Sequence, residues 1–423
     1  MKLSRSERSW ILYDWANSAY SIIITTAVFP LFYETIVSQE TYLSTWAFGN
    51  SLASAVVAVL APILGTIADY KGRKRGFFSV FLGLGVTSTL AMVLLSSGQW
   101  FVAIAVYVAS VIGFSGANVF YDAFLVDVTT NERMDRISSS GFGWGYIGSV
   151  IPFVIVILLA LNYEGFGLAS QAMAYRIGFL LTGLWWGLFS IPILKNVRQQ
   201  YWIEPSATPI KDSFVRIGRT LKNVRQHKNI FVFLAAYIFY IEGVNTIIRM
   251  ATPIARSMGI DSTTLIIVLL AIQIVAFPFA ILYGALAKRF SGRKMLFVGI
   301  GVYVVVTFIA FLLPSFSEGL RTVMFWVLSM LVASSQGGIQ ALSRSYFGKI
   351  VPKEKSAEFF GFYNVVGKFA AIIGPLLVGL FTVLTGEERY GVLSILLLFI
   401  VGGLLLTRTK READLPGTAA RTE

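Results

Sequence analysis

The chain has 423 residues, of which 56% are hydrophobic and only 13% are charged. Soluble domains average about 25% charged residues, so the composition excludes a soluble globular protein and indicates an integral membrane protein. The formal net charge of +13 would suggest nucleic acid binding in a soluble chain. Here most Lys and Arg residues lie at the termini and in alternate breaks between apolar runs, which is the positive-inside pattern. We therefore attribute the charge to topology and to contact with the lipid bilayer, and expect no nucleic acid partner.

The reactive side chains are scarce. The sequence has no cysteine and a single histidine, His227, which lies in a basic loop. An enzyme embedded in the membrane would need a nucleophile with a base, or a set of metal ligands, and these residue counts exclude most such chemistry. No phosphate-binding loop motif is present. We therefore expect no enzymatic activity, no cofactor, no metal and no direct use of ATP.

Apolar runs long enough to cross a bilayer, which takes about 20 residues, follow one another along the whole chain. Each is predicted to be a helix, because lipid offers no partner to a free backbone N–H or C=O. The predicted fold class is an all-α integral membrane protein with 12 transmembrane helices. The runs are 11–36, 44–69, 76–96, 100–128, 139–161, 174–195, 229–256, 263–288, 294–313, 321–348, 357–384 and 388–407.

One long connection, 196–228, divides the spans six and six. Apolar residues recur there at helical spacing between basic ones, which predicts an amphipathic helix on the inner membrane surface. The basic breaks place both termini in the cytoplasm. The predicted organisation is a six-helix bundle, a cytoplasmic linker, a second six-helix bundle and a cytoplasmic tail, at 1–195, 196–228, 229–407 and 408–423.

The two halves repeat each other. Gly65 corresponds to Gly284, and the Gly-Arg-Lys turn at Gly72 returns at Gly292. The pair Gly141-Phe142 returns at Gly361, an offset of 220 residues. A repeat of half the chain length, with the same orientation in each half, predicts two parallel six-helix bundles with a site between them.

The turn between the second and third spans carries the pattern G-x-x-x-D-x-x-G-R-K. This pattern resembles the signature loop of the major facilitator superfamily, and the twelve spans and the repeat agree with it along the whole chain. Two further stretches, YDWANSAY (13–20) and SRSYFGKIVPKEKSAEFFGFYNVVGKFAAIIGP (343–375), resemble the family of vacuole effluxers related to autophagy and its bacterial relatives, and EGVNTIIRMA (242–251) fits it too.

The resemblance implies that the signature turn is a cytoplasmic latch between the halves. A glycine at the end of the second span allows close helix approach, and an aspartate can face a helix N-terminus. The alternative is that the basic residues only fix topology. In the second copy Lys288 or Arg289 replaces the aspartate, so the two latches should differ in strength. The predicted latch residues are Gly65, Asp69, Gly72, Arg73, Lys74 and Asp127, with Arg73 pairing with Asp127.

Ionisable side chains inside a span cost at least about 2.5–3.5 kcal/mol each, so each needs a reason. Glu242 lies near the middle of the seventh span, and Asn245 and Arg249 follow on the same helix face. The acid and the cation, about 10 Å apart along the axis, could hold a zwitterion or form a proton site. The alternative is a structural ion pair.

Four other groups are candidates for substrate binding or proton coupling. Asp122 in the fourth span is a second proton-carrier candidate, and Asp14 with Asn17 in the first span faces either the cavity or the membrane interface. Arg344 lies near the inner end of the tenth span and is expected to pair with Glu358 rather than touch substrate. Lys368 lies too deep in the eleventh span to reach water and is expected to pair with an unidentified buried acid.

The sequence predicts a secondary active transporter of the cell inner membrane that works by alternating access. We expect it to move a small polar or amphipathic solute, best an amino acid, with proton coupling, as a monomer, and in the direction of export. The alternatives are a lipid or drug exporter of the same fold, since the chain has 34 Phe and 18 Tyr, and a membrane sensor that transports nothing.

Overall fold

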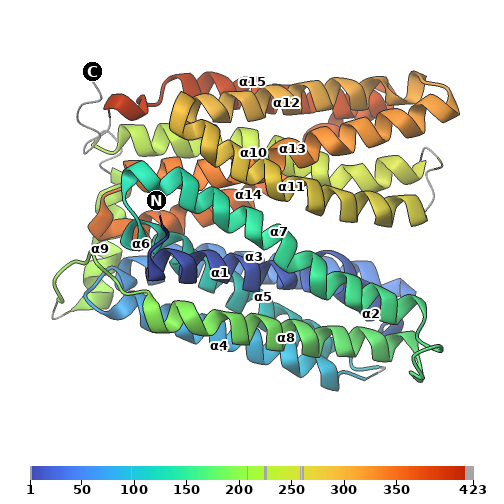
Figure 1. Ribbon diagram of the computed structural model, residues 1–423, viewed down its shortest axis with the longest axis horizontal. Helices are drawn as coiled ribbons and strands as arrows, with labels where there is room; N and C mark the ends of the chain where they lie inside the picture. The colour runs from blue at the N-terminus through green and yellow to red at the C-terminus, as the bar shows by residue number, and fades with distance from the viewer. Residues whose placement is uncertain are drawn as a thin grey trace. The chain divides into compact units, whose positions relative to one another are not determined.

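The computed structural model describes residues 2–414 except 97, 207, 223–225, 258, 260 and 261. Those residues form helices joined by short turns (Figure 1). Among them, eleven helices are long and apolar enough to cross a membrane. The one predicted span that is not among these eleven is the eleventh, 357–384, which corresponds to α14 (Ser356–Thr385) and whose described stretch Ile373–Thr385 is also apolar. The prediction of an all-helical membrane protein is confirmed.

The chain divides into two compact units. Unit 1 consists of Met1–Val128, Trp144–Ile217 and Pro352–Phe362, and unit 2 of Thr129–Gly143, Gly218–Val351 and Tyr363–Glu423. The first part of α7 (Asn131–Leu161) therefore belongs to unit 2, and the first turns of α14 belong to unit 1. The boundaries read from the sequence, which cut between the halves at the linker, stay a prediction.

Unit 1 holds the helices of the first six spans apart from the first part of α7. The first span contains η1 (Ser21–Ala27), a π-helical segment in which the Thr25 and Thr26 hydroxyls donate to the Ser21 carbonyl. Helices α4 and α5 approach closely where Gly85 meets Gly113, because a Cβ on Gly113 would lie 2.3 Å from the Gly85 nitrogen. The elements are α1 (Arg5–Tyr20), α2 (Val28–Ile36), α3 (Gln39–Ala68), α4 (Arg73–Ala91), α5 (Trp100–Ala123), α6 (Leu125–Val128), α7 (Asn131–Leu161) and α8 (Gln171–Asn196).

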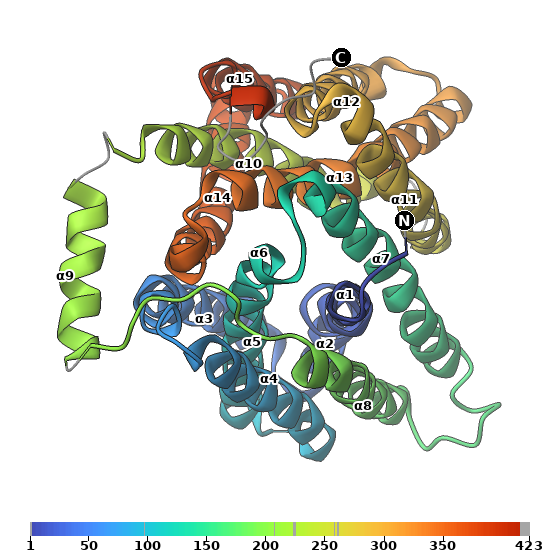
Figure 2. The ribbon, with the colours of Figure 1, turned by 60° about the vertical axis from the view of Figure 1, so that its left-hand side comes forward.

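Unit 2 repeats much of this plan, and α12 lies beside α15 within it (Figures 1 and 2). Its elements are α10 (Lys228–Ser257), α11 (Ser262–Phe290), α12 (Gly292–Leu312), α13 (Glu318–Ile350) and α15 (Glu388–Thr407). Each unit contains a buried contact between a tyrosine hydroxyl and a serine hydroxyl. The Tyr20 hydroxyl lies 2.8 Å from the Ser110 hydroxyl in unit 1, and the Tyr240 hydroxyl lies 2.7 Å from that of Ser343 in unit 2.

The linker contains α9 (Pro209–Lys222). Ser213 and Thr220 are buried, whereas Phe214 and Val215 are about half exposed. The protein therefore covers the stripe of small polar residues and leaves apolar side chains on the open flank. A helix of this kind can lie in a membrane interface, as the sequence predicts.

The predicted orientation can be tested by cysteine labelling, because the native chain has no cysteine. Thr41 in the first turn of α3 and Ser317 just before α13 are exposed, and Lys71 is exposed in the turn that follows α3. With both termini cytoplasmic, Thr41→Cys and Ser317→Cys should react with an impermeant maleimide on intact cells. Lys71→Cys should react only after permeabilisation, and reaction from outside would contradict the orientation.

Candidate functional site

The turn between α3 and α4 places a buried aspartate at the start of another helix. Asp69 caps α3, and Gly72 adopts the left-handed conformation, with φ of 76°, just before α4 begins. The two Asp69 carboxylate oxygens accept the backbone N–H groups of Ala357 and Glu358 at 2.9 and 3.0 Å. These belong to the first turn of α14, whose N–H groups have no partner within the helix. The helix N-terminus favours a negative charge at this place, and burial of the carboxyl opposes it.

Close approach of two backbones makes this contact possible. A Cβ on Gly65 would lie 2.3 Å from the Ala357 carbonyl oxygen, and a Cβ on Gly361 would lie 2.7 Å from that of Ala61. Glycine is therefore required on both α3 and α14 where they cross. Gly65 comes from the first half of the sequence and Gly361 from the second. Both were singled out as repeat positions, and both lie where α3 crosses α14 inside unit 1.

A buried ion pair lies beside Asp69. The Lys74 ammonium is 2.7 Å from Asp127, and both side chains are 0% exposed. Lys74 also donates to the Ser356 hydroxyl at 2.8 Å, and the other Asp127 oxygen accepts the N–H groups of Gln200 and Tyr201. The sequence suggested Arg73 as the partner of Asp127. The structure places Lys74 there, because the helix that starts after Gly72 turns the Arg73 side chain to the surface.

The linker helix supplies a cation that the sequence analysis missed. Arg216 of α9 donates to Glu358 at 2.9 Å, lies 3.6 Å from Asp69 and donates to the Thr66 carbonyl. Its spacing from Ser213 and Thr220 puts it on the stripe that faces the protein, which is the signal that could have revealed it. We call Asp69, Lys74, Asp127, Arg216 and Glu358 the first loop cluster.

Burial makes the ionisation of Asp69 sensitive to pH. It raises the pKa of the carboxyl from 3.8 to about 7, and Lys74, Arg216 and the two N–H donors oppose this rise. Since the folded protein holds the proton more tightly than the unfolded chain, wild type should lose stability relative to Asp69→Asn as pH rises from about 4 to about 7. The loss is about 4 kcal/mol at most.

Melting curves of both proteins across pH 4 to 9 would measure this difference. The gap in melting temperature should widen up to about pH 7 and then stay constant. Parallel pH profiles would contradict a shifted Asp69. Glu204→Gln on the same linker is a suitable control, because its side chain is exposed and its titration should not change the gap.

The second turn is built differently. Ser291 takes the positive φ, at 80°, and the N–H of Gly292 donates to Glu412 of the C-terminal segment at 2.8 Å. Lys349 lies 2.6 Å from Asp135 and 2.7 Å from Glu412. We call Asp135, Arg293, Lys349 and Glu412 the second loop cluster, in which Arg293 donates to the last carbonyls of α15.

The acids of the second loop cluster come from distant segments. Lys288 and Arg289, which occupy the position of the first-turn aspartate in the repeat, are both exposed. Asp135 at the start of α7 and Glu412 after α15 supply the negative charge instead. Nothing near the second turn in the sequence indicates this.

Arg344 lies in unit 2 beside the start of α7. It is 3% exposed, donates to the hydroxyl and carbonyl of Ser138 at 3.0 and 3.1 Å, and stacks 4.4 Å over the Phe142 ring. Glu358 is bonded to Arg216 of the first loop cluster, and its expected pairing with Arg344 stays a prediction. The guanidinium of Arg344 therefore fixes the α13–α7 crossing within unit 2.

Glu242 is buried completely, at 0% exposure, in the middle of α10. One carboxylate oxygen accepts the N–H of Gly374 in α14 at 2.5 Å and lies 3.4 Å from the Thr246 hydroxyl. The other oxygen is buried and has no hydrogen-bond partner among the residues that the structure describes. Gly374 is required here, since a Cβ would lie 2.7 Å from the Glu242 oxygen.

The neighbours of Glu242 on its helix face differ in exposure. Asn245 is half-buried and Arg249 is exposed, so the cation is accessible while the acid is not. Lys368 lies within α14, but its side chain is outside the described residues, and its expected acid partner stays a prediction.

The candidate residues of the first and fourth spans lie in unit 1. Asp14 and Asp122 are 7% and 8% exposed, and Asn17 donates to the Asn118 amide oxygen at 2.8 Å, which joins α1 to α5. Trp10 stacks on Tyr121 at a ring distance of 4.5 Å. Two acids with little exposure are thus held on neighbouring helices by amide and aromatic contacts.

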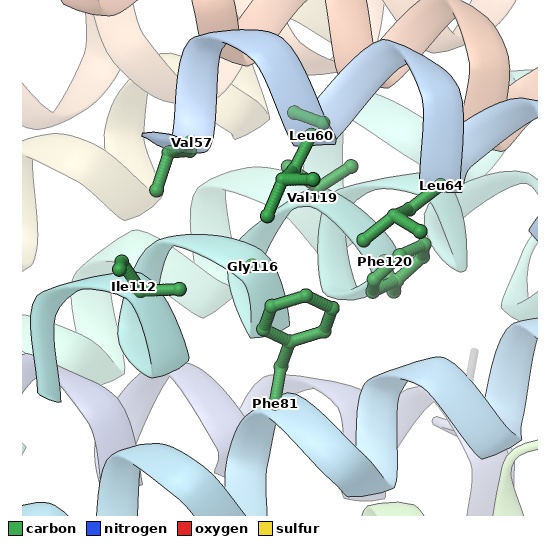
Figure 3. Close-up of a pocket in the computed structure, with 9 residues that line it drawn as sticks. Val57, Leu60, Leu64, Phe81, Ile112, Gly116, Val119 and Phe120 are labelled. Carbon is green, nitrogen blue, oxygen red and sulfur yellow. The ribbon is translucent and has the colours of Figure 1, made fainter. Parts of the chain in front are cut away.

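The enclosed spaces inside the units are small. A cavity between α3, α4 and α5, towards which Phe81 and Val57 point (Figure 3), holds about 10 Å³, and one between α10, α12, α13 and α15 about 20 Å³. Each has room for a water molecule at most. Among the described residues, no group of three His, Asp or Glu side chains could hold a metal ion.

Sequence comparison agrees with the resemblance noted above. A profile described as "Vacuole effluxer Atg22 like" matches residues 39–414. The uncharacterized MFS-type (major facilitator superfamily) transporter YxiO of Bacillus subtilis is 49% identical over 419 residues, covering 98% of this chain and 96% of that protein. Autophagy-related protein 22 of Cryptococcus neoformans is 29% identical over 321 residues, covering 71% of this chain and 57% of its own length.

Solved structures share the fold at low sequence identity. The proton:xylose symporter XylE has a TM-score of 0.71 at 12% identity, over 95% of this chain and 94% of its own. A bacterial homologue of the iron transporter ferroportin has a TM-score of 0.70 at 14% identity, over 96% and 100%. These likenesses concern the fold alone. With a family profile over most of its length and a relative nearly half identical from end to end, this chain belongs to the Atg22-like vacuole effluxer family and is a transporter of the major facilitator superfamily rather than an enzyme.

Proposed function

We propose that this protein is a proton-coupled secondary transporter that exports a small polar or amphipathic solute by alternating access, with amino acids as the favoured substrate class. The name of the matched family, vacuole effluxer, supports the transport of a solute out of a membrane-bound compartment. The identity to YxiO, itself uncharacterized, supports transport without naming a substrate.

Glu242 is the observation that carries the proposal. An ionisable group at mid-span costs free energy and marks a functional site by default. Its carboxyl has one oxygen fixed by Gly374 and a second that is buried with no hydrogen-bond partner among the described residues. Two discrete bonding states, with and without a proton on that oxygen, are what a proton carrier needs. Asn245 and Arg249 on the same face are proposed to meet the solute.

The other candidates receive supporting roles. Asp14 and Asp122 are proposed as a second acidic site in unit 1, with Asn17 holding α1 against α5. The first loop cluster is proposed as the cytoplasmic latch, because it ties the α3–α4 turn of the first half of the sequence to the start of α14 from the second half. Such a latch need only be modest, since each transport cycle must release it.

The positive-inside pattern supports a place in the cell membrane with both termini in the cytoplasm. We propose that the protein works as a monomer.

Proteoliposomes that contain a pH-sensitive dye would test the function. Addition of the transported amino acid should move protons in a fixed ratio to the solute, and an imposed pH gradient should drive the solute uphill. Mixtures of amino acids, then single compounds, would identify the class. A rate of solute movement that does not depend on the pH gradient would contradict proton coupling. Movement of lysolipids or drugs in place of amino acids would favour the alternative substrate class.

A further inference from the structure

An open groove of about 380 Å³ runs along the start of α1 in unit 1. It is far larger than the two cavities inside the units and falls in the range of small-molecule sites, about 300–1,000 Å³. Helix α1 packs between α7 and α8 (Figure 2), and the groove is lined by Leu12 and Trp15 of α1, Trp144 of α7 and Phe189 of α8.

The groove is shaped by a close contact between α1 and α7. Gly148 leaves room for the Trp15 carbonyl, which a Cβ would approach to 2.4 Å. The Trp144 ring stays beside this contact, 45% exposed and 6.1 Å from the Trp15 ring. Trp15 also stacks on Trp185 at 5.6 Å. Rigid rings on three helices thus hold the groove open.

One end of the groove is charged. Arg8 is its one charged lining residue, and no described residue forms an ion pair with its guanidinium. Arg5 precedes it by three positions, so both cations share the helix face that continues into Leu12 and Trp15. Arg8 and Trp15 are about 10 Å apart along the axis. The groove therefore offers a cationic head followed by an apolar and aromatic channel.

We propose that this groove is a binding site for one anionic phospholipid, with the phosphate on Arg8 and an acyl chain along Leu12, Trp15, Trp144 and Phe189. The chain spans a membrane, so phospholipid is always next to this helix. Arginine suits phosphate because its guanidinium donates in a planar fork. Basic residues at the end of a span attract anionic lipid, and Trp is enriched at the membrane–water interface. The site is independent of the proposed proton coupling.

Native mass spectrometry of the purified full chain would test the site with phosphatidylglycerol and phosphatidylcholine of identical acyl chains. Wild type should retain one phosphatidylglycerol about fivefold more tightly than phosphatidylcholine, the effect of one favourable cation. Arg8→Gln should reduce phosphatidylglycerol binding to the phosphatidylcholine level. Lys288→Gln, which removes an exposed cation at the end of α11, should behave as wild type.

Leu12→Trp would fill the channel and should weaken both lipids, which separates the channel from the charge. Glycerol phosphate, which has the head group chemistry without chains, should not displace the lipid at equal concentration. The proposal is overturned if Arg8→Gln keeps the preference for phosphatidylglycerol, if wild type has none, if Leu12→Trp binds both lipids normally, or if glycerol phosphate competes.

Discussion

Transport driven by a pH gradient is expected to fall at least 100-fold in Glu242→Gln, while exchange of solute for solute across the membrane continues. The glutamine keeps the size of the side chain, and its amide oxygen can still accept the N–H of Gly374. It cannot bind or release a proton, so steps that carry a net proton stop. Exchange needs no net proton movement and should survive. Effects of this size are typical when a positioned acid or base is removed.

Counterflow and gradient-driven uptake in the same proteoliposomes would measure the two modes. Glu318→Gln, at an exposed helix start, is the matched control and should retain both. If Glu242 bound a substrate ammonium group instead, both modes would fail together and solute binding would weaken. Full pH-dependent transport by Glu242→Gln would exclude both roles.

A second variant tests whether the position of the Glu242 carboxyl matters as well as its presence. Gly374→Ala keeps Glu242 but places a methyl group 2.7 Å from its oxygen and still closer to the Thr246 hydroxyl. The carboxyl must move away from the α14 backbone, so coupled transport should fall more than exchange does. Equal loss of both modes would mean that the glycine serves only the packing of α10 on α14.

The spans, the turns and the family could be recognised from sequence because their signals are local. Hydropathy runs reveal helices, since lipid allows no other structure. Gly65, Asp69 and Gly72 lie within eight residues of one another, so the turn could be read as a unit. Glu242 stood out because a charge at mid-span is rare.

The bonding partners of the residues in the two loop clusters could not be predicted from the sequence, because they come from distant parts of the chain. Asp69 is bonded to N–H groups nearly 290 residues away, and backbone donors leave no mark in a sequence. The choice between Arg73 and Lys74 depends on the rotation of α4 after Gly72, which adjacent cations do not reveal. Glu412 joins the second loop cluster from a segment that reads as a tail.

Lys74→Met is expected to lower the free energy of unfolding by about 3 kcal/mol, near the lower end of the range for breaking a buried ion pair. Lys74 and Asp127 are both 0% exposed, so the remaining carboxylate cannot regain water. Its two N–H donors from Gln200 and Tyr201 remain, which keeps the loss from being larger. Were the pair at the surface, the cost would be under about 1 kcal/mol.

The double variant Lys74→Met, Asp127→Asn is the decisive comparison. It removes both charges and leaves the Asn oxygen free to accept the two N–H groups, so most of the lost stability should return. Lys71→Met, three residues earlier and exposed, should change stability by less than about 0.5 kcal/mol. Equilibrium unfolding of wild type, the double variant and the single variants Lys74→Met, Asp127→Asn and Lys71→Met in mixed micelles would measure these values. If the double variant were as unstable as the sum of its single changes, the two charges would be acting independently. Lys74 would then matter for its bond to Ser356 at the start of α14 rather than for Asp127.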